Sequence, residues 1–155
     1  MIRGSEQVSS GVSLTGSAVS GEVTGGLAYA IDGTVNGEGR SYTGGLAGYV
    51  YAVDEVSDCT SLGTVNGHDY EGAGFLPYEN SYYALGGAFG QVYMVHSVTG
   101  VDARSDISTA LVFGDDDLYF IGLFAGRSDT DWSDGNSCHN SGDYDFIGEI
   151  GNIEY

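Results

Sequence analysis

A short glycine-centred element recurs along this chain, and it limits the possible folds more than any other feature. Its clearest copies are residues 24–28 (TGGLA), 43–48 (TGGLAG) and 85–90 (LGGAFG), and weaker copies follow at 121–126, 146–151 and 72–76. Paired glycines occur where the backbone turns sharply or approaches another chain segment so closely that a Cβ would clash. The recurrence therefore predicts many short strands and an all-β fold rather than helices.

Two further elements recur between the glycine strands. A small-Val-small-Gly turn occurs at 18–21, 34–37, 64–67 and 97–100, with its glycines 16, 30 and 33 residues apart. A cysteine-bearing segment occurs at 57–63 and again at 136–142. Because the order of turn, glycine strand, polar connection and cysteine segment is kept, we interpret the chain as a repeat protein.

A parallel β-helix (solenoid) is the fold that this repetition favours. One copy cannot bury its own apolar face, whereas stacked copies about 4.8 Å apart bury a continuous interior. Leu27, Leu46 and Phe124 are expected to form one inward ladder, and Val19, Val35, Val65 and Val98 a second. The glycines expected to shape the corners are Gly44, Gly45, Gly48, Gly86 and Gly87, and Leu46 is the apolar residue of the first of these motifs. A β-sandwich with glycine-rich hairpins is the alternative, and a small propeller or prism is a further one.

Length and composition indicate a single domain. The 155 residues are 41% hydrophobic, which is enough for one packed core. Residues 1–14 are polar and Ser-rich and are expected to form an N-terminal tail or cap, and residues 15–155 the β-repeat domain.

The charge is strongly one-sided, with 22 acidic residues against four arginines and no lysine, a formal net charge of -18. Phosphates would be repelled, so nucleic acids and anionic membrane surfaces are excluded as partners. No apolar run of 18 or more residues occurs, so we expect no transmembrane segment. The acidity fits a solvated surface that opposes aggregation, an adaptation to high salt, or binding of divalent cations.

The stretch from Tyr42 to Gly67 (YTGGLAGYVYAVDEVSDCTSLGTVNG) resembles the GLUG repeat, a module named for Gly-Leu-any-Gly. That motif is Gly45-Leu46-Ala47-Gly48 here, and SCHNSGDYDFIGEIGN near the C-terminus resembles a second copy. The resemblance implies a bacterial or archaeal surface protein, often an adhesin or the stalk of a large secreted protein. The family has no assigned catalytic residues, so the resemblance supplies none.

Cys59 and Cys138 lie in the two similar segments and are expected at equivalent repeat positions, about two to three repeats apart. That separation, about 10–14 Å along a stack, exceeds the distance a disulfide can span. The expectation is two buried free thiols, with an intramolecular or inter-subunit disulfide as the alternative.

Two carboxylate clusters could hold calcium, the one cofactor that the sequence suggests. Asp115 and Asp117 belong to a run of three aspartates, while Asp129, Asp131 and Asp134 alternate with other residues as in a calcium loop. The glycine that follows comes one residue later than in an EF-hand. A polar turn is the alternative interpretation.

No catalytic motif emerges from the sequence. Gly114-Asp115-Asp116 superficially resembles part of a pectin-hydrolase site, but the three histidines are scattered and basic residues are almost absent. Tyrosines near the glycine strands, at Val50-Tyr51 and from Tyr78 to Tyr83, predict either strand packing or an adhesive face.

The expected function is therefore that of a structural or adhesive module at the cell surface or outside the cell, and not that of an enzyme. Its expected partners are further copies of itself, in an oligomer or filament, and surface carbohydrate. The alternatives are a β-helix that binds or cleaves carbohydrate and an acidic module stabilised by calcium.

Overall fold

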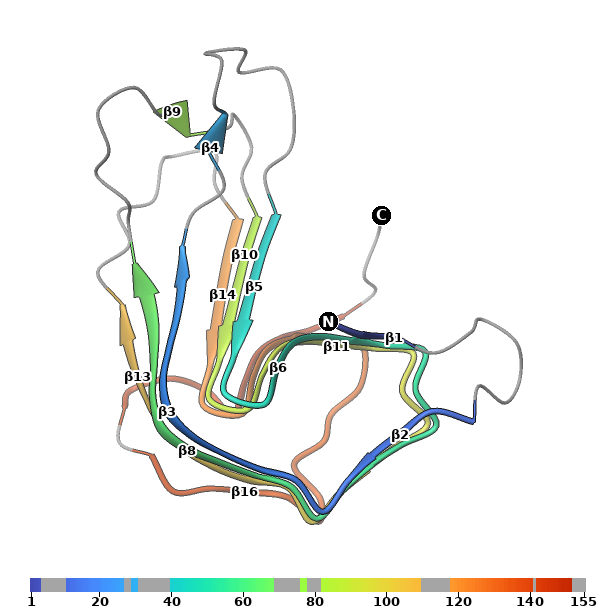
Figure 1. Ribbon diagram of the computed structural model, residues 1–155. Helices are drawn as coiled ribbons and strands as arrows, with labels where there is room; N and C mark the ends of the chain where they lie inside the picture. Colours follow the sequence, from blue (N-terminus) through green and yellow to red (C-terminus); the bar gives the residue numbers. More distant parts are fainter. Residues whose placement is uncertain are drawn as a thin grey trace.

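The computed structural model describes residues 1–3, 11–26, 29–30, 40–68, 76–77, 82–109, 118–140 and 142–151. Within these ranges the protein is built of short strands and contains no helix, so none there is long and apolar enough to cross a membrane (Figure 1). The prediction of an all-β fold is confirmed.

Four parallel sheets contain most of the strands. The central sheet has the order β1 (Ile2–Arg3), β6 (Ala47–Tyr51), β11 (Phe89–Tyr93), β15 (Ala125–Ser128) and β17 (Ile147–Ile150). The arm sheet has the order β14 (Leu118–Gly122), β10 (Tyr82–Gly86) and β5 (Arg40–Gly44). The short sheet has the order β12 (Ser97–Thr99), β7 (Glu55–Ser57) and β2 (Ser13–Thr15). The long sheet has the order β16 (Ser137–Cys138), β13 (Asp102–Thr109), β8 (Thr60–His68) and β3 (Ala18–Gly26). A separate antiparallel pair joins β4 (Tyr29–Ala30) to β9 (Leu76–Pro77).

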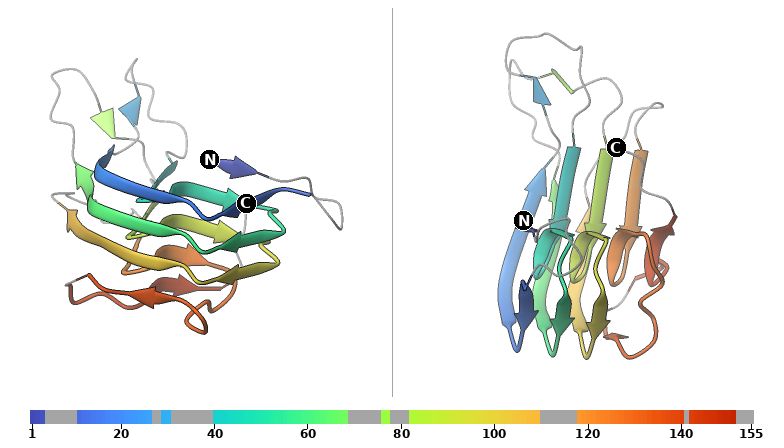
Figure 2. Two further views of the ribbon diagram at one scale, coloured as in Figure 1. Left: turned by 60° about the horizontal axis from the view of Figure 1, so that its bottom comes forward. Right: turned by 90° about the vertical axis from the view of Figure 1, so that its right-hand side faces the viewer.

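The chain visits these sheets repeatedly in the same order, and we call each circuit a pass. The second pass contains β5 to β8, the third β10 to β13, and the fourth β14 to β16. Most strands of neighbouring passes pair 42 residues apart, as Thr60 does with Asp102. The offset shortens to 36 residues between Tyr82 and Leu118, and to 22 between Ala125 and Ile147. Figure 2 shows the passes laid on one another from the N-terminal to the C-terminal end. The four larger sheets are parallel and open-edged.

A glycine bend connects the arm sheet to the central sheet in three passes. Gly44, Gly86 and Gly122 are register partners, so the paired glycines at 44–45 and 86–87 occupy equivalent places, as predicted. A Cβ on Gly86 would lie 2.1 Å from the Phe89 carbonyl oxygen and 2.7 Å from the Ala125 Cα. Only glycine permits this approach, because both obstacles are backbone atoms.

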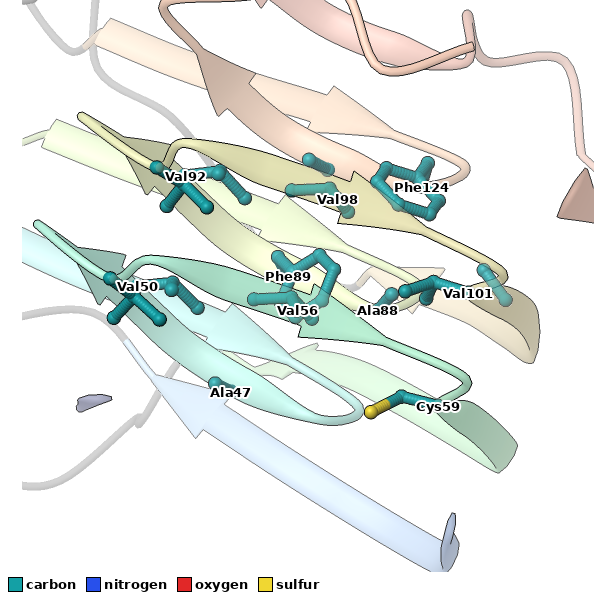
Figure 3. Close-up of a cluster of buried hydrophobic side chains, with 14 of the residues drawn as sticks. Ala47, Val50, Val56, Cys59, Ala88, Phe89, Val92, Val98, Val101 and Phe124 are labelled. Atoms are coloured by element: carbon teal, nitrogen blue, oxygen red, sulfur yellow. The ribbon is translucent and has the colours of Figure 1, made fainter. Parts of the chain in front are cut away.

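Valines at every third position form the main core. Val50, Val53, Val56 and Cys59 are almost fully buried, and the next pass places Val92, Val95, Val98 and Val101 in the same pattern. Figure 3 shows Val50 beside Val92, Val56 beside Val98, and Phe89 near Phe124. In the first of these passes Val50 lies in β6 and Val56 in β7, while Val53 and Cys59 lie in the tight corners that follow these strands. At these corners Ala52, Asp58 and Met94 have positive φ, and so does Gly100.

Part of the predicted inward packing is confirmed and part is wrong. Leu46, Ala88, Phe124 and Phe146 follow one another across passes, joined by backbone hydrogen bonds of 2.8–2.9 Å, so Leu46 and Phe124 do share a ladder. The second ladder does not form. Its members pair with other residues: Val19 with Ser61, Val65 with Val23 and Ile107, and Val98 with Val56, which in turn pairs with Leu14. Leu27 and Val35 lie outside the described residues.

Two sequence alignments behind the repeat also need correction. Gly25, expected in the glycine-strand series, pairs with Gly67 in the long sheet and so is not equivalent to Gly44. The copy at 146–151 is shifted by three residues, because Ile147 pairs with Ala125. Both errors come from matching dipeptides without knowing the 42-residue register. Most of the copy at 72–76 and the turn at 34–37 lie outside the described residues.

The described part of the polar segment 1–14 contributes to the sheets. Ile2 pairs with Val50, and β2 begins at Ser13 and pairs with β7, so the expected boundary after residue 14 falls inside a strand. Val12 and Leu14 pack against the main core.

Candidate functional site

Six aromatic rings meet on the outer side of the glycine bend, and we call this cluster the aromatic corner. Its members are Tyr42, Tyr82 and Phe120 from the arm sheet, and Tyr49, Tyr51 and Tyr93 from the central sheet. Alternation along β6 directs Tyr49 and Tyr51 away from the core face that carries Val50. The bend then brings β5 and β6 to an angle in which their outer faces meet (Figure 1).

The rings form one continuous series. The centroids of consecutive rings lie 5.6 Å apart between Tyr93 and Tyr51, 5.8 Å between Tyr51 and Tyr49, and 5.0 Å between Tyr49 and Tyr42. The series continues 5.6 Å to Tyr82 and 5.3 Å to Phe120. Separations of 4.5–7 Å are those of favourable aromatic pairs, so the rings stabilise the angle between the two sheets.

A row of polar side chains lines the central-sheet side of the corner. Gln91, Arg127 and Glu149 are register partners in β11, β15 and β17. The Tyr82 hydroxyl donates a 2.6 Å hydrogen bond to Gln91 Oε1 and accepts one of 3.2 Å from Arg127. The Arg127 guanidinium lies 4.9 Å from the Phe120 ring centroid, and its Nε is 3.3 Å from Glu149 Oε2. The row therefore links three passes through charge and hydrogen bonds.

The inner end of the corner is closed. Tyr49 is 8% exposed and Gln91 is 1% exposed. Burial raises the pKa of Tyr82 to about 12, although the nearby Arg127 acts in the opposite direction. Tyr82 thus remains a neutral hydrogen-bond donor near neutral pH.

The outer end of the corner is open. Tyr51 and Tyr93 are only partly buried, and their rings stack at an interplanar angle of 23°. They are direct register partners on neighbouring strands. The corner therefore offers solvent two stacked phenols at the edge of a packed cluster.

The sequence identified only part of this cluster. Of the tyrosines singled out, Tyr51 and Tyr82 belong to it, whereas Tyr83 is buried in the arm sheet, where it lines a small cavity with Thr43 and Leu85. Tyr78 lies outside the described residues. Tyr42, Tyr49, Tyr93 and Phe120 and their polar neighbours were missed. The useful signal was the alternation of tyrosine with valine in YVY and QVY, spaced by 42 residues.

The proposed calcium ligands form turns where the structure describes them. Asp129 Oδ2 accepts a 2.9 Å hydrogen bond from the Met94 amide, and Asp131 Oδ1 accepts one of 2.9 Å from the Ser133 amide. The Ser133 amide holds the pKa of Asp131 below its usual value. Asp134 is exposed, and Asp115 and Asp117 lie outside the described residues. Over the described ranges, no group of three His, Cys, Asp or Glu side chains is placed to hold a metal ion.

Both cysteines are free thiols, as predicted, but their positions are not equivalent. Cys138 pairs with Ala103, which pairs with Ser61, so Cys138 occupies the place two residues beyond Cys59. Cys59 is fully buried, whereas Cys138 is only partly buried. Desolvation, followed by the charge of Asp102, raises the pKa of the Cys138 thiol to about 12.

Asp102 is the centre of a polar clamp between the third and fourth passes. Its carboxylate accepts hydrogen bonds from Ser137 Oγ (3.1 Å) and Arg104 Nε, and contacts His139 Nδ1 at 2.8 Å. Desolvation alone would raise the pKa of Asp102, but the bonds from His139, Arg104 and Ser137 outweigh it and lower that pKa. The clamp fastens β16 to β13, where the strand pairing is only two residues long.

No protein-family model matches the chain, and comparisons with curated proteins and with solved structures also give no match.

Proposed function

We propose that this protein is a β-solenoid module of an extracellular or cell-surface protein, with a structural or adhesive role. The parallel, in-register pairing of successive passes supports the solenoid interpretation, because each pass covers the apolar face of its neighbour. The resemblance of residues 42–67 to the GLUG repeat supports the surface location. The module would act by self-association or by attachment to a surface, and the proposal assigns it no catalytic residues.

Exposed apolar side chains on two edge strands, β14 and β17, carry the self-association proposal. Tyr119 in β14 is 53% exposed, although its register partner Tyr83 is 4% exposed. Ile150 in β17 is 49% exposed, whereas Val92, two strands away at the same register position, is 1% exposed. Leu118, which precedes Tyr119 in β14, is 59% exposed. Apolar groups on open strand edges favour pairing with another chain, and the occupant we propose is a second copy of this protein.

Charge sets the condition for this association. Each copy has a formal net charge of -18, so two copies repel each other in dilute buffer. Added salt screens that repulsion over about 10 Å at 0.1 M ionic strength. We therefore expect larger assemblies at high salt and at high protein concentration.

Sedimentation and electron microscopy of the purified chain over a salt series test this proposal, with and without calcium. The wild type is expected to form dimers or longer assemblies as salt increases, and the variants Tyr119→Lys and Ile150→Lys are expected to stay monomeric. Met94→Lys is the matched control, because Met94 is 46% exposed but lies at a corner between β11 and β12. Monodisperse small particles of the wild type under all these conditions would refute self-association.

Carbohydrate binding is the second candidate function, and the open end of the aromatic corner favours it. Partly exposed tyrosine rings bind sugars through their faces, and their hydroxyls supply hydrogen bonds. Calorimetric titration with neutral polysaccharides tests this function, with Tyr93→Ala as the loss variant and Tyr144→Ala as the control. Absence of binding heat for the wild type, or equal binding by both variants, would exclude the corner as the sugar site.

A further inference from the structure

We propose that Tyr51 and Tyr93 form an oxidative modification site, at which a one-electron oxidant couples their rings and covalently joins the second pass to the third. Four observations select this pair: strand register, ring geometry, exposure and the surrounding aromatic series. The proposal does not depend on the function proposed above.

Register and ring geometry hold the two phenols together. Tyr51 and Tyr93 are direct partners in the parallel pairing of β6 with β11, and their side chains leave the same face of the central sheet. Their rings are stacked with centroids 5.6 Å apart at an interplanar angle of 23°. Although the residues are 42 positions apart in sequence, folding holds their rings side by side, and this proximity strongly raises the rate of coupling.

Exposure together with stacking distinguishes this pair from the other close pairs of tyrosines. Tyr42 stacks on Tyr49 at 5.0 Å, but Tyr49 is only 8% exposed. Tyr82 lies 5.6 Å from Tyr42 and hydrogen-bonds to the buried Gln91. Tyr42 and Tyr82 are both partly open to solvent, but their rings are tilted at 56°, whereas Tyr51 and Tyr93 combine stacking with partial exposure of both residues. An oxidant can therefore reach them while the protein is folded.

The reaction balances with a peroxidase and hydrogen peroxide as the oxidant. Each phenol loses one electron and its hydroxyl proton to give a phenoxyl radical. A carbon–carbon bond forms between the ring carbons beside the two hydroxyls, and the hydrogens on those carbons move to the oxygens, which restores both phenols. The pair thus loses two hydrogen atoms in total, and one hydrogen peroxide accepts them and becomes two water molecules.

The remaining rings of the aromatic corner favour reaction at this pair. Tyr51 is 5.8 Å from Tyr49, which continues the series to Tyr42 and Tyr82. A radical formed on any of these phenols can exchange with its neighbour at such a distance, and only the outer pair combines stacking with access. The product is expected to be a monomer with an internal cross-link.

Treatment of the folded chain with peroxidase and hydrogen peroxide tests the proposal. The expected product has dityrosine fluorescence, a mass lower by two hydrogen atoms, and a cross-linked peptide that contains residues 51 and 93. Its thermal midpoint should rise, because the cross-link restricts the unfolded chain as a disulfide would.

Conservative variants keep the test independent of folding. Tyr51→Phe and Tyr93→Phe retain the stacked rings but lack the hydroxyl from which the radical forms, so each should lose the internal product. Tyr144→Phe also removes one phenol and is the matched control, which should react like the wild type. Unfolding in urea should likewise suppress the internal product. A product that persists in Tyr51→Phe, or cross-links that occur mainly between molecules, would overturn the proposal.

Discussion

The glycine bend gives the sharpest test of the fold, through the single substitution Gly86→Ala. A Cβ at this position would lie 2.1 Å from the Phe89 carbonyl oxygen, 2.7 Å from the Ala125 Cα and 2.7 Å from the Gly126 nitrogen. All three distances are shorter than real Cβ contacts, and all three atoms belong to backbone that no rotamer change can move. The substitution must therefore displace either the bend or the neighbouring pass.

The expected loss of stability follows from that displacement. Overpacking of a tightly packed interior costs about 1–3 kcal/mol, and a clash with backbone on two sides belongs at or above the upper end of this range. We expect Gly86→Ala to lower the free energy of unfolding by about 3 kcal/mol or more. For a chain of this length such a loss lowers the thermal midpoint by roughly 6–12 °C, at about 2–4 °C for each kcal/mol.

Gly151→Ala is the control for this measurement. Gly151 has no atom within 4 Å of its would-be Cβ, and its φ lies outside the left-handed region. Alanine there is expected to leave stability unchanged, or to raise it by up to about 1 kcal/mol through the unfolded chain. Urea denaturation followed by circular dichroism measures both variants. The explanation of the bend would be refuted if Gly86→Ala stayed within about 0.5 kcal/mol of the wild type, a typical effect for surface substitutions.

Three further predictions concern the core, the clamp and the thiols. Phe124→Ala should cost about 3–5 kcal/mol in urea denaturation, because this ring is fully buried, whereas Phe146→Ala, at a partly buried position in the same ladder, should cost clearly less. Asp102→Asn should lower the free energy of unfolding at neutral pH. Because the folded protein has a lowered pKa at Asp102, the extra stability of the wild type should vanish as the pH falls through that pKa, and the unfolding curves of wild type and variant should then converge. An aromatic disulfide reagent at mildly alkaline pH should leave Cys59 and Cys138 almost unmodified in the folded chain and modify both after unfolding; rapid reaction of folded Cys138 would contradict its raised pKa.

The sequence was most informative where one physical constraint permits one residue type. Gly44 and Gly86 must lack a Cβ, so their equivalence could be predicted from the letters alone. Valine occurs in many surroundings, so a local motif around it does not fix its partner. Matching Val19 to Val65 and Val98 by such a motif predicted one shared ladder, whereas the strand register gives these valines other partners. The register is set by hydrogen bonds between strands 42 positions apart in sequence, and a short local motif gives no information about that distance. The shortened offset in the last passes made the later copies harder still to align.

The aromatic corner was harder to predict because it depends on an angle between sheets rather than on a motif. Tyr42 and Tyr49 lie on either side of the bend, and they stack only because the backbone turns sharply between them. The glycine bend and the aromatic corner are therefore physically linked. Any side chain that widens the bend must also separate the arm sheet from the central sheet, and so part the rings that stabilise their angle. Widening the bend should not separate Tyr51 from Tyr93, because both residues belong to the central sheet. A variant at the bend should therefore disturb the inner rings before it affects the outer pair, so Gly86→Ala is expected to keep the proposed cross-link between Tyr51 and Tyr93 in its folded fraction.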